Sequence, residues 1–273
     1  MISIKNITFG YNRHHAVLSD FSLDFQSGGV YGLLGKNGTG KSTLLYLIMG
    51  LLRPSAGSVQ VDGMEACKRL PQMLSELFLV PEEYDMPRVT LREYVRVIKP
   101  FYPNFSVDLL HRCLDGFDMS PEVHLGGLSM GQKKKVYMCL ALATNTRYLL
   151  MDEPTNGLDI LSKSQFRRVL LEGVTEEKTI IISTHQVHDV ESLLDHILIL
   201  SSQKLLLDAS VAEITDKYVF EYRLPNEMDD ALYAEPSLQG NAVIAPRKAD
   251  SGETQVNLES LFNAVTQGRI KTE

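Results

Sequence analysis

Hydrophobic and polar positions alternate in two segments near the start of the chain. Residues 2–9 (ISIKNITF) and 17–25 (VLSDFSLDF) carry an apolar side chain at roughly every second position, which is the period of a strand with one buried face. A third alternating segment, SVQVDG, spans residues 58–63. It follows RPSAG (53–57), which would end a preceding helix. Together these segments predict an N-terminal antiparallel β subdomain.

Continuous apolar runs indicate a second kind of strand. The segments VYGLLG (30–35), YLLMDE (148–153) and TIIIST (179–184) are apolar on both faces, as in parallel strands covered by helices on each side. The run KSTLLYLIMGLL (41–52) is too long for a typical strand and predicts a buried helix, whereas QFRRVLLEGV (165–174) predicts an amphipathic helix. Strands that alternate with helices predict an α/β fold with a mostly parallel core sheet.

The pattern becomes helical and interrupted by prolines between about residues 83 and 135. Prolines occur at 87, 100 and 103, next to the helical patterns LREYVRVI (91–98) and DLLHRCLDGF (108–117). We interpret this stretch as an α-helical subdomain inserted into the α/β domain.

The chain becomes more polar after about residue 208. Ser210 and Glu213 have the spacing of a capping box, VFEYRL (219–224) is suited to a strand, and LESLFNAVT (258–266) to a short helix. We therefore predict a small C-terminal α+β accessory region at 209–273. No motif in it points to a particular chemistry.

Length, charge and cysteine content restrict the class of protein. A chain of 273 residues permits one ordinary domain and a smaller unit, and a formal net charge of −7 argues against a nucleic-acid coat. No signal-peptide pattern and no bilayer-spanning apolar run is found, so we expect a cytoplasmic chain that can still dock on a membrane protein. The three cysteines (Cys67, Cys113 and Cys139) are far apart and are interpreted as small hydrophobic residues in a reducing compartment.

A glycine-rich segment, GKNGTGKST at 35–43, follows a predicted strand and opens a predicted helix. Its glycines let several backbone N–H groups point at one anion, and the helix N-terminus adds partial positive charge. We expect Lys41 to reach the β- and γ-phosphates of a nucleotide and Ser42 to bind Mg²⁺; the alternative is a glycine-rich turn. The predicted nucleotide-binding residues of this segment are Gly35, Lys36, Asn37, Gly38, Thr39, Gly40, Lys41, Ser42 and Thr43.

Polar side chains also follow two of the buried strands. In LLMDEPTNGLD (149–159), Asp152 is predicted to hold the Mg²⁺ shell and Glu153 to act as general base on a water. Two adjacent carboxylates would repel each other without a cation, so the pair suggests a metal site. The alternative is a strand end capped by solvated acidic side chains. His185 follows TIIIST and is expected to donate to the γ-phosphate or to orient the water; a structural histidine is the alternative.

The order of these motifs resembles that of ABC-type ATPases, the nucleotide-binding subunits of ABC transporters. GKNGTGKST is similar to the Walker A loop, YLLMDE to Walker B, and LSMGQ (128–132) to the signature motif. The resemblance covers about residues 1–208, which we predict to be the ATP-binding domain. It implies a P-loop NTPase fold, ATP hydrolysis, and Mg²⁺ as cofactor.

The resemblance also implies roles for individual residues. Lys41, Glu153 and His185 would be catalytic, His185 as the switch histidine, and Asp159 in GLD would belong to the D-loop. Tyr11 would stack on adenine, whereas an ordinary strand-end tyrosine is the competing interpretation. The signature residues Ser129, Met130, Gly131 and Gln132 would act on the ATP of a second copy of the chain.

Two positions depart from the family's pattern. Met130 stands where the signature usually has glycine, so its side chain must point away from the nucleotide. In LVPEEYD (79–85), Glu82 stands where glutamine is usual, at the position that links Mg²⁺ and the attacking water to the helical subdomain. A glutamate accepts from water and approaches a metal, but it offers no amide N–H and adds negative charge beside the phosphates.

The resemblance further implies a head-to-tail homodimer that ATP closes, and integral membrane permease subunits on other chains. It places the chain peripherally on the cytoplasmic face of the cell membrane, with export favoured over import. The alternative is a soluble ABC ATPase that acts on nucleic acid, the ribosome or protein assembly. The strongest basic run consists of Lys133, Lys134 and Lys135, which we interpret as a solvated helix face or as an attraction for phosphate near the dimer seam. We therefore expect no nucleic-acid partner.

Overall fold

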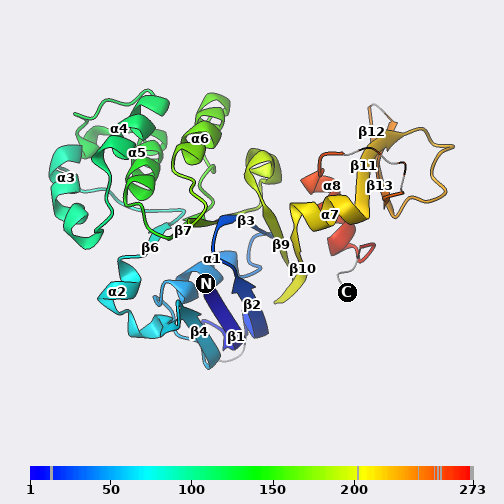
Figure 1. Cartoon of the computed structure of the whole chain (residues 1–273), viewed down its shortest axis with the longest axis horizontal. Helices are drawn as coiled ribbons and strands as arrows, with labels where there is room; N and C mark the ends of the chain where they lie inside the picture. Colours follow the sequence, from blue (N-terminus) through cyan, green and yellow to red (C-terminus); the bar gives the residue numbers. More distant parts are fainter. Residues whose placement is uncertain are drawn as a thin grey trace.

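The computed structural model describes residues 1–12, 15–201, 203–238, 240–248, 250, 252 and 254–270. The described residues form a four-stranded N-terminal sheet, a six-stranded central sheet and a three-stranded C-terminal sheet (Figure 1). The helices α3, α4 and α5 lie at one end of the view, and the C-terminal strands and helices lie at the other.

The N-terminal sheet is antiparallel, with the strand order β2-β1-β4-β5. Ile2 and Ile4 of β1 are fully buried, and after a register shift the alternation resumes with Ile7 and Phe9, which confirms a strand with one buried face. The turn Asp62–Gly63 joins β4 to β5, and both of its residues have positive φ (47° and 77°), as two-residue hairpins prefer. The strands are β1 (Ile2–Phe9), β2 (Leu18–Phe25), β4 (Ala56–Val61) and β5 (Met64–Glu65).

The central sheet has six strands in the order β10-β9-β3-β8-β7-β6. Among the described residues, the five strands from β9 to β6 form four parallel pairs, and β10 pairs antiparallel with β9. The mostly parallel core sheet is therefore confirmed. Its strands are β3 (Gly29–Leu34), β6 (Leu77–Val80), β7 (Tyr148–Asp152), β8 (Thr179–Thr184), β9 (His196–Ser201) and β10 (Lys204–Ser210).

Both faces of the central sheet are covered. Leu149 and Ile180 pack into the hydrophobic cluster that includes the helices α4, α5 and α6. Leu150 and Ile181, the next residues along the same strands, pack into the cluster shared with α1 and the N-terminal sheet. This double burial explains why β3, β7 and β8 are continuous apolar runs.

The first helix, α1 (Lys41–Ile48), is shorter than the predicted helix at 41–52. Gly50 has a φ of +65°, and the N–H of Leu51 donates to the carbonyl of Tyr46 at 2.9 Å. A left-handed glycine after the last turn ends a helix in this way. A side chain at Gly50 would also lie only 2.0 Å from the carbonyl oxygen of Ala66, so this glycine stops the helix although the apolar run continues.

The inserted helical part follows β6. Helix α3 (Leu91–Ile98) begins with a capping box between Thr90 and Glu93. Helix α5 (Met130–Ala143) starts at the surface and continues into the core, where its last six residues are buried. The remaining helices before the C-terminal region are α2 (Pro71–Leu74), α4 (Val107–Gly116), α6 (Ile160–Glu172) and the 3₁₀ turns η1 (Ala66–Lys68), η2 (Lys99–Phe101), η3 (Leu125–Gly127), η4 (Val187–Asp189) and η5 (Glu191–Leu193).

The C-terminal region joins the main core through its last helix. The side chain of Glu191 accepts from the N–H of Leu258 at 2.7 Å, and Leu261 is buried in the same cluster as the central sheet. The predicted capping box of Ser210 and Glu213 is present. The region consists of α7 (Val211–Lys217), β11 (Tyr218–Arg223), β12 (Tyr233–Ser237), β13 (Gly240–Pro246) and α8 (Leu258–Thr266).

Two further expectations concern the cysteines and bilayer-spanning helices. Cys113 and Cys139 are buried free thiols, as expected, whereas Cys67 is half-buried. No helix within the described ranges has the length and apolar character required to cross a bilayer.

Candidate functional site

The glycine-rich loop connects β3 to α1 and wraps around one ammonium group. Nζ of Lys41 donates to the carbonyl of Gly35 at 2.8 Å and to that of Lys36 at 3.4 Å. Gly40, the residue before the helix, has a φ of +101°, a conformation that a residue with a side chain rarely adopts. The loop therefore presents its backbone N–H groups at the start of α1, the arrangement that binds anions.

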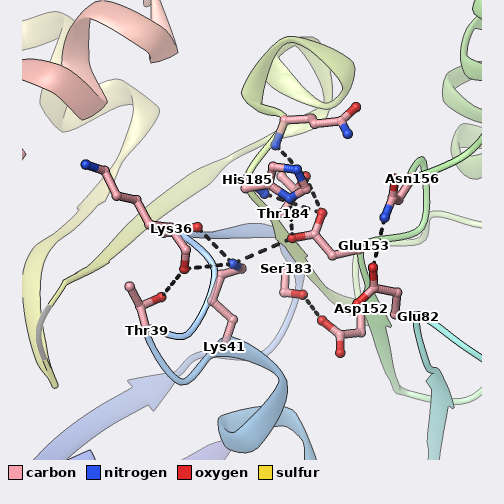
Figure 2. A network of polar contacts seen from close by, with 12 residues as sticks. Lys36, Thr39, Lys41, Glu82, Asp152, Glu153, Asn156, Ser183, Thr184 and His185 are labelled. Carbon is pink, nitrogen blue, oxygen red and sulfur yellow. Dashed lines mark hydrogen bonds and ion pairs between the residues drawn. The ribbon is translucent and has the colours of Figure 1, made fainter. Parts of the chain in front are cut away.

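Lys41 also faces a carboxylate from the end of β7. Its Nζ lies 3.6 Å from Oε1 of Glu153, and both side chains are about 5% exposed. Figure 2 shows that the two side chains come from opposite sides of the site and point toward each other. Burying a carboxylate without a cationic partner is costly, and Lys41 supplies that partner. The pair also links the glycine-rich loop to the end of β7.

The carboxylate of Glu153 is held in place by the end of β8. It accepts from Oγ1 of Thr184 at 3.1 Å and lies 2.8 Å from Nδ1 of His185 (Figure 2). The His185 side chain is 35% exposed. Glu153 itself has a φ of +45°, an uncommon value outside glycine that is often found at functional sites.

The neighbouring Asp152 is buried and 1% exposed. Burial raises the pKa of Asp152, hydrogen bonds from the hydroxyls of Ser183 and Ser42 oppose this shift, and the charges of Glu153 and Glu82 reinforce it. Carboxylates in such a setting favour a nearby cation. The hydroxyl of Ser42 and the carboxylate of Asp152 are hard oxygen donors of the kind that Mg²⁺ prefers.

The segment LSMGQ lies at the surface, at the N-terminus of α5. Ser129 caps the helix and forms a capping box with Gln132, with contacts of 3.0 and 3.3 Å. Met130 is 67% exposed. That its side chain points away from the nucleotide stays a prediction. Asp159 likewise caps α6, where it accepts from the N–H of Ser162 at 2.7 Å. Neither cap belongs to the network around Lys41 that Figure 2 draws.

A model of the ABC transporter family matches residues 18–156, about half of the chain. The matched segment contains the glycine-rich loop, LSMGQ and the two carboxylates at the end of β7, Asp152 and Glu153.

The chain belongs to the ABC transporter family.

Curated relatives agree with this assignment. The ABC transporter ATP-binding protein YtrB of Bacillus subtilis is 29% identical over 80% of this chain and 75% of its own length. The ABC transporter ATP-binding protein NatA of the same organism is 32% identical over 68% of this chain and 79% of its own length. The chain is thus an ATP-binding subunit of an ABC transporter, and subunits of this family hydrolyse ATP to power transport in association with membrane subunits.

The fold is that of solved ABC subunits. A structure described as the ATP-binding subunit of an ABC transporter superimposes with a TM-score of 0.69, at 24% identity, and covers 78% of this chain and 91% of that one. The P-loop NTPase fold predicted from the sequence is therefore confirmed.

Tyr11 lies beside the Walker A helix. Its side chain is 65% exposed, its hydroxyl lies 3.1 Å from Oγ1 of Thr43, and its ring meets Phe9 edge to face at 5.1 Å. The ring and the hydroxyl of Tyr11 thus contact the protein while the residue remains largely open to solvent. This position is compatible with stacking on a base, and the stacking role stays a prediction.

The basic run after the signature differs from the solvated face that we expected. Lys134 is 9% exposed, and its Nζ donates to the carbonyls of Asn156 at 2.6 Å and Glu153 at 3.3 Å. Lys135 donates to Oε1 of Gln165 at 2.9 Å and lies above the ring of Phe117. The run is therefore largely engaged within the protein, which removes the sequence feature that most favoured a nucleic-acid partner.

Besides Thr184, which donates to Glu153, three further residues of the site were not predicted. Lys134, Asn156 and Ser183 hold the predicted residues, because Asn156 donates to Glu82 at 2.8 Å and Ser183 donates to Asp152. Ser183 was detectable in principle, since it lies one residue from the end of an apolar strand. For Lys134 the sequence offers only the basic run, which by itself indicates exposure.

Proposed function

We propose that Lys41, Glu153 and His185 form the catalytic centre for ATP hydrolysis. The observation that carries this proposal is the buried contact of Lys41 with Glu153 at 3.6 Å, together with the 2.8 Å contact of Glu153 with His185. A cation that can bind phosphate, a base and an orienting imidazole thus meet at the ends of two parallel strands.

The proposed reaction follows from these positions. The carboxylate of Glu153 takes a proton from a water as the water oxygen bonds to the γ-phosphorus, and the bond to the β-phosphate oxygen breaks to leave ADP. Lys41 exchanges its contacts with the loop carbonyls for phosphate oxygens and stabilises their charge. His185 orients the water or donates to the γ-phosphate. The backbone N–H groups of residues 35–43 hold the β-phosphate, and Tyr11 stacks on the adenine.

Mg²⁺ is the proposed cofactor. Within the described residues no group of three or more histidine, cysteine, aspartate and glutamate side chains forms a metal-holding cluster. Mg²⁺ commonly binds proteins through one or two oxygens and completes its shell with substrate phosphates and water. Ser42 and Asp152 would hold it, with Glu82 nearby, and when bound it neutralises charge that develops on the phosphates.

Homodimerisation is proposed from the separation of the two phosphate-binding features. Ser129 lies at an exposed helix N-terminus, outside the network around Lys41. A second copy related by a two-fold axis would bring its Ser129 and α5 N-terminus to this chain's ATP, and Asp159 would lie in the same seam. Hydrolysis would then loosen the dimer.

The membrane partners are proposed to be permease subunits at the cytoplasmic face of the cell membrane. Purification of a tagged chain from detergent-solubilised membranes tests this proposal. A polytopic membrane protein should co-purify in a ratio near one to one with the ATPase dimer. Recovery with ribosomes or nucleic acid and without such a protein would instead favour a soluble ABC ATPase. Export stays a prediction of the sequence.

A further inference from the structure

Lys134 differs from the lysines on either side of it. Its side chain turns into the protein and is 9% exposed, whereas Lys133 and Lys135 are half-buried. An ammonium that leaves water is destabilising unless other groups compensate its charge and hydrogen bonds. The buried position of Lys134 therefore requires an explanation in its surroundings.

Those surroundings are the residues after β7. Nζ of Lys134 donates to the carbonyls of Asn156 at 2.6 Å and Glu153 at 3.3 Å. The amide Nδ2 of the same Asn156 donates to Oε1 of Glu82 at 2.8 Å, as Figure 2 shows. Asn156 thus bridges an ammonium on one side and a carboxylate on the other.

The charges of this group oppose one another. Burial lowers the pKa of Lys134, and the carboxylates of Glu82, Glu153 and Asp152 raise it again. Three carboxylates lie around the site, and Lys41 pairs directly with only one of them, Glu153. Lys134 supplies a second buried cation near these carboxylates, held by the carbonyls of Glu153 and Asn156.

The position of Lys134 along α5 connects this network to the signature. Ser129 caps the helix five residues earlier, and from Val136 onward most of α5 is buried in the core. Because the helix is a rigid element, a shift of the backbone at Glu153 or Asn156 would be passed to Ser129.

We propose that Lys134 is a positioning residue that holds the signature helix α5 against Glu153 and, through Asn156, balances the charge of Glu82. It links the ATP site of its own chain to the signature that the chain presents to its partner. This inference rests on the proposed function, because only a dimer with shared sites uses such a link.

A double-mutant cycle tests the pairing. Lys134→Gln removes the buried cation, and Glu82→Gln removes the carboxylate while keeping Oε1 as an acceptor for Asn156. Each single variant should lower the kcat for ATP at least about tenfold and change the Kd for ATP less than about threefold, because Lys41 and its loop are intact. The double variant should recover a kcat within about threefold of the native value, because the two opposite charges are removed together and the net charge of the site is the native one.

Lys133→Gln is the matched control and should hydrolyse ATP at the native rate. A cycle in which the two substitutions add, or a Lys134→Gln protein with native kcat, would overturn the pairing. If Lys134→Gln alone does not fold, adding it to Glu82→Gln must still raise kcat above that of Glu82→Gln; a double variant that is slower or unfolded counts against the inference.

The cycle also has a readout that is independent of turnover. The melting temperatures of the four proteins should show the same non-additivity, with the double variant closest to native. A native chain that binds ATP but never hydrolyses it would refute the proposed function, and the melting temperatures would then decide the pairing by themselves.

Discussion

Nζ of Lys41 lies 3.6 Å from Oε1 of Glu153, in a setting where both side chains are almost completely buried. The same ammonium donates to the carbonyl of Gly35, so one cation joins the Walker A loop to the end of the Walker B strand. Phosphate oxygens carry more charge than a carbonyl and would compete for this ammonium when ATP binds. ATP binding would therefore change the surroundings of Glu153, the proposed base, through its contact with Lys41.

Lys41→Ala should abolish tight ATP binding. The substitution removes charge-assisted hydrogen bonds to the phosphates, which are worth about 1.5–3 kcal/mol each, so the affinity should fall by about tenfold to a hundredfold or more. Calorimetric titration with ATP and Mg²⁺ measures the change. Lys68→Ala, at a side chain that is 63% exposed in the η1 turn, serves as the control. Unaltered affinity of Lys41→Ala would eliminate the role given to this lysine.

Met130→Gly should raise ATP turnover by a few fold. The side chain is 67% exposed at the first position of α5 and must be accommodated when a second copy approaches. Loss of the helix-favouring residue costs about 1 kcal/mol at most, so the protein should remain folded. Met130→Leu keeps the bulk and should behave as native. An unchanged kcat would show that the position only has to keep its side chain out of the way.

Lys178→Met should stabilise the protein at neutral pH. Lys178 is 3% exposed, its Nζ has no hydrogen-bond partner within the described part of the chain, and burial lowers its pKa from 10.5 to about 8. Below pH 8 the lysine is charged in both the folded and the unfolded state, and its burial costs up to about 3 kcal/mol. Replacement by methionine removes this cost.

The free energy of unfolding of the native protein should change with pH because Lys178 titrates differently in the folded and unfolded states. Between about pH 8 and 10.5 the unfolded chain binds a proton at Lys178 that the folded chain has lost, so the native free energy of unfolding should rise with pH relative to Lys178→Met. Urea unfolding at pH 7, 8.5 and 10 measures the difference. Lys204→Met, at an exposed lysine, is the control. A gap between native and Lys178→Met that stays constant over this range would contradict the assignment.

The sequence predicted the fold where burial leaves a clear period. Three strands of the central sheet are covered on both faces and read as apolar runs, and β1, β2 and β4 alternate because they have one buried face. Strand β6 was missed because LFLV is only four residues long and precedes the segment of Glu82. Strands β9 and β10 were also missed, and β12 and β13 carry half-exposed and polar positions that hide their period.

The candidate site was predictable in its chain order but not in its packing. Asp152, Glu153 and His185 were proposed because each lies where a buried apolar strand ends, whereas Ser183 and Thr184 lie within a strand and Lys134 and Asn156 enter the site from a helix and a turn. The start of α6 was missed for a related reason. Ile160 and Leu161 are 89% and 68% exposed, which masks the amphipathic pattern, while Asp159 caps the helix.

The most direct test of the account is the oligomeric state of Glu153→Gln with ATP. Glutamine keeps the size and the hydrogen-bonding oxygen of this residue but removes the proposed base, so ATP should bind and remain uncleaved. Size-exclusion chromatography at micromolar protein with ATP and Mg²⁺ should show a dimer that disappears with ADP, while the native chain returns to monomer as ATP is consumed. A Glu153→Gln chain that binds ATP and remains monomeric would contradict the head-to-tail dimer, and with it the role proposed for Ser129.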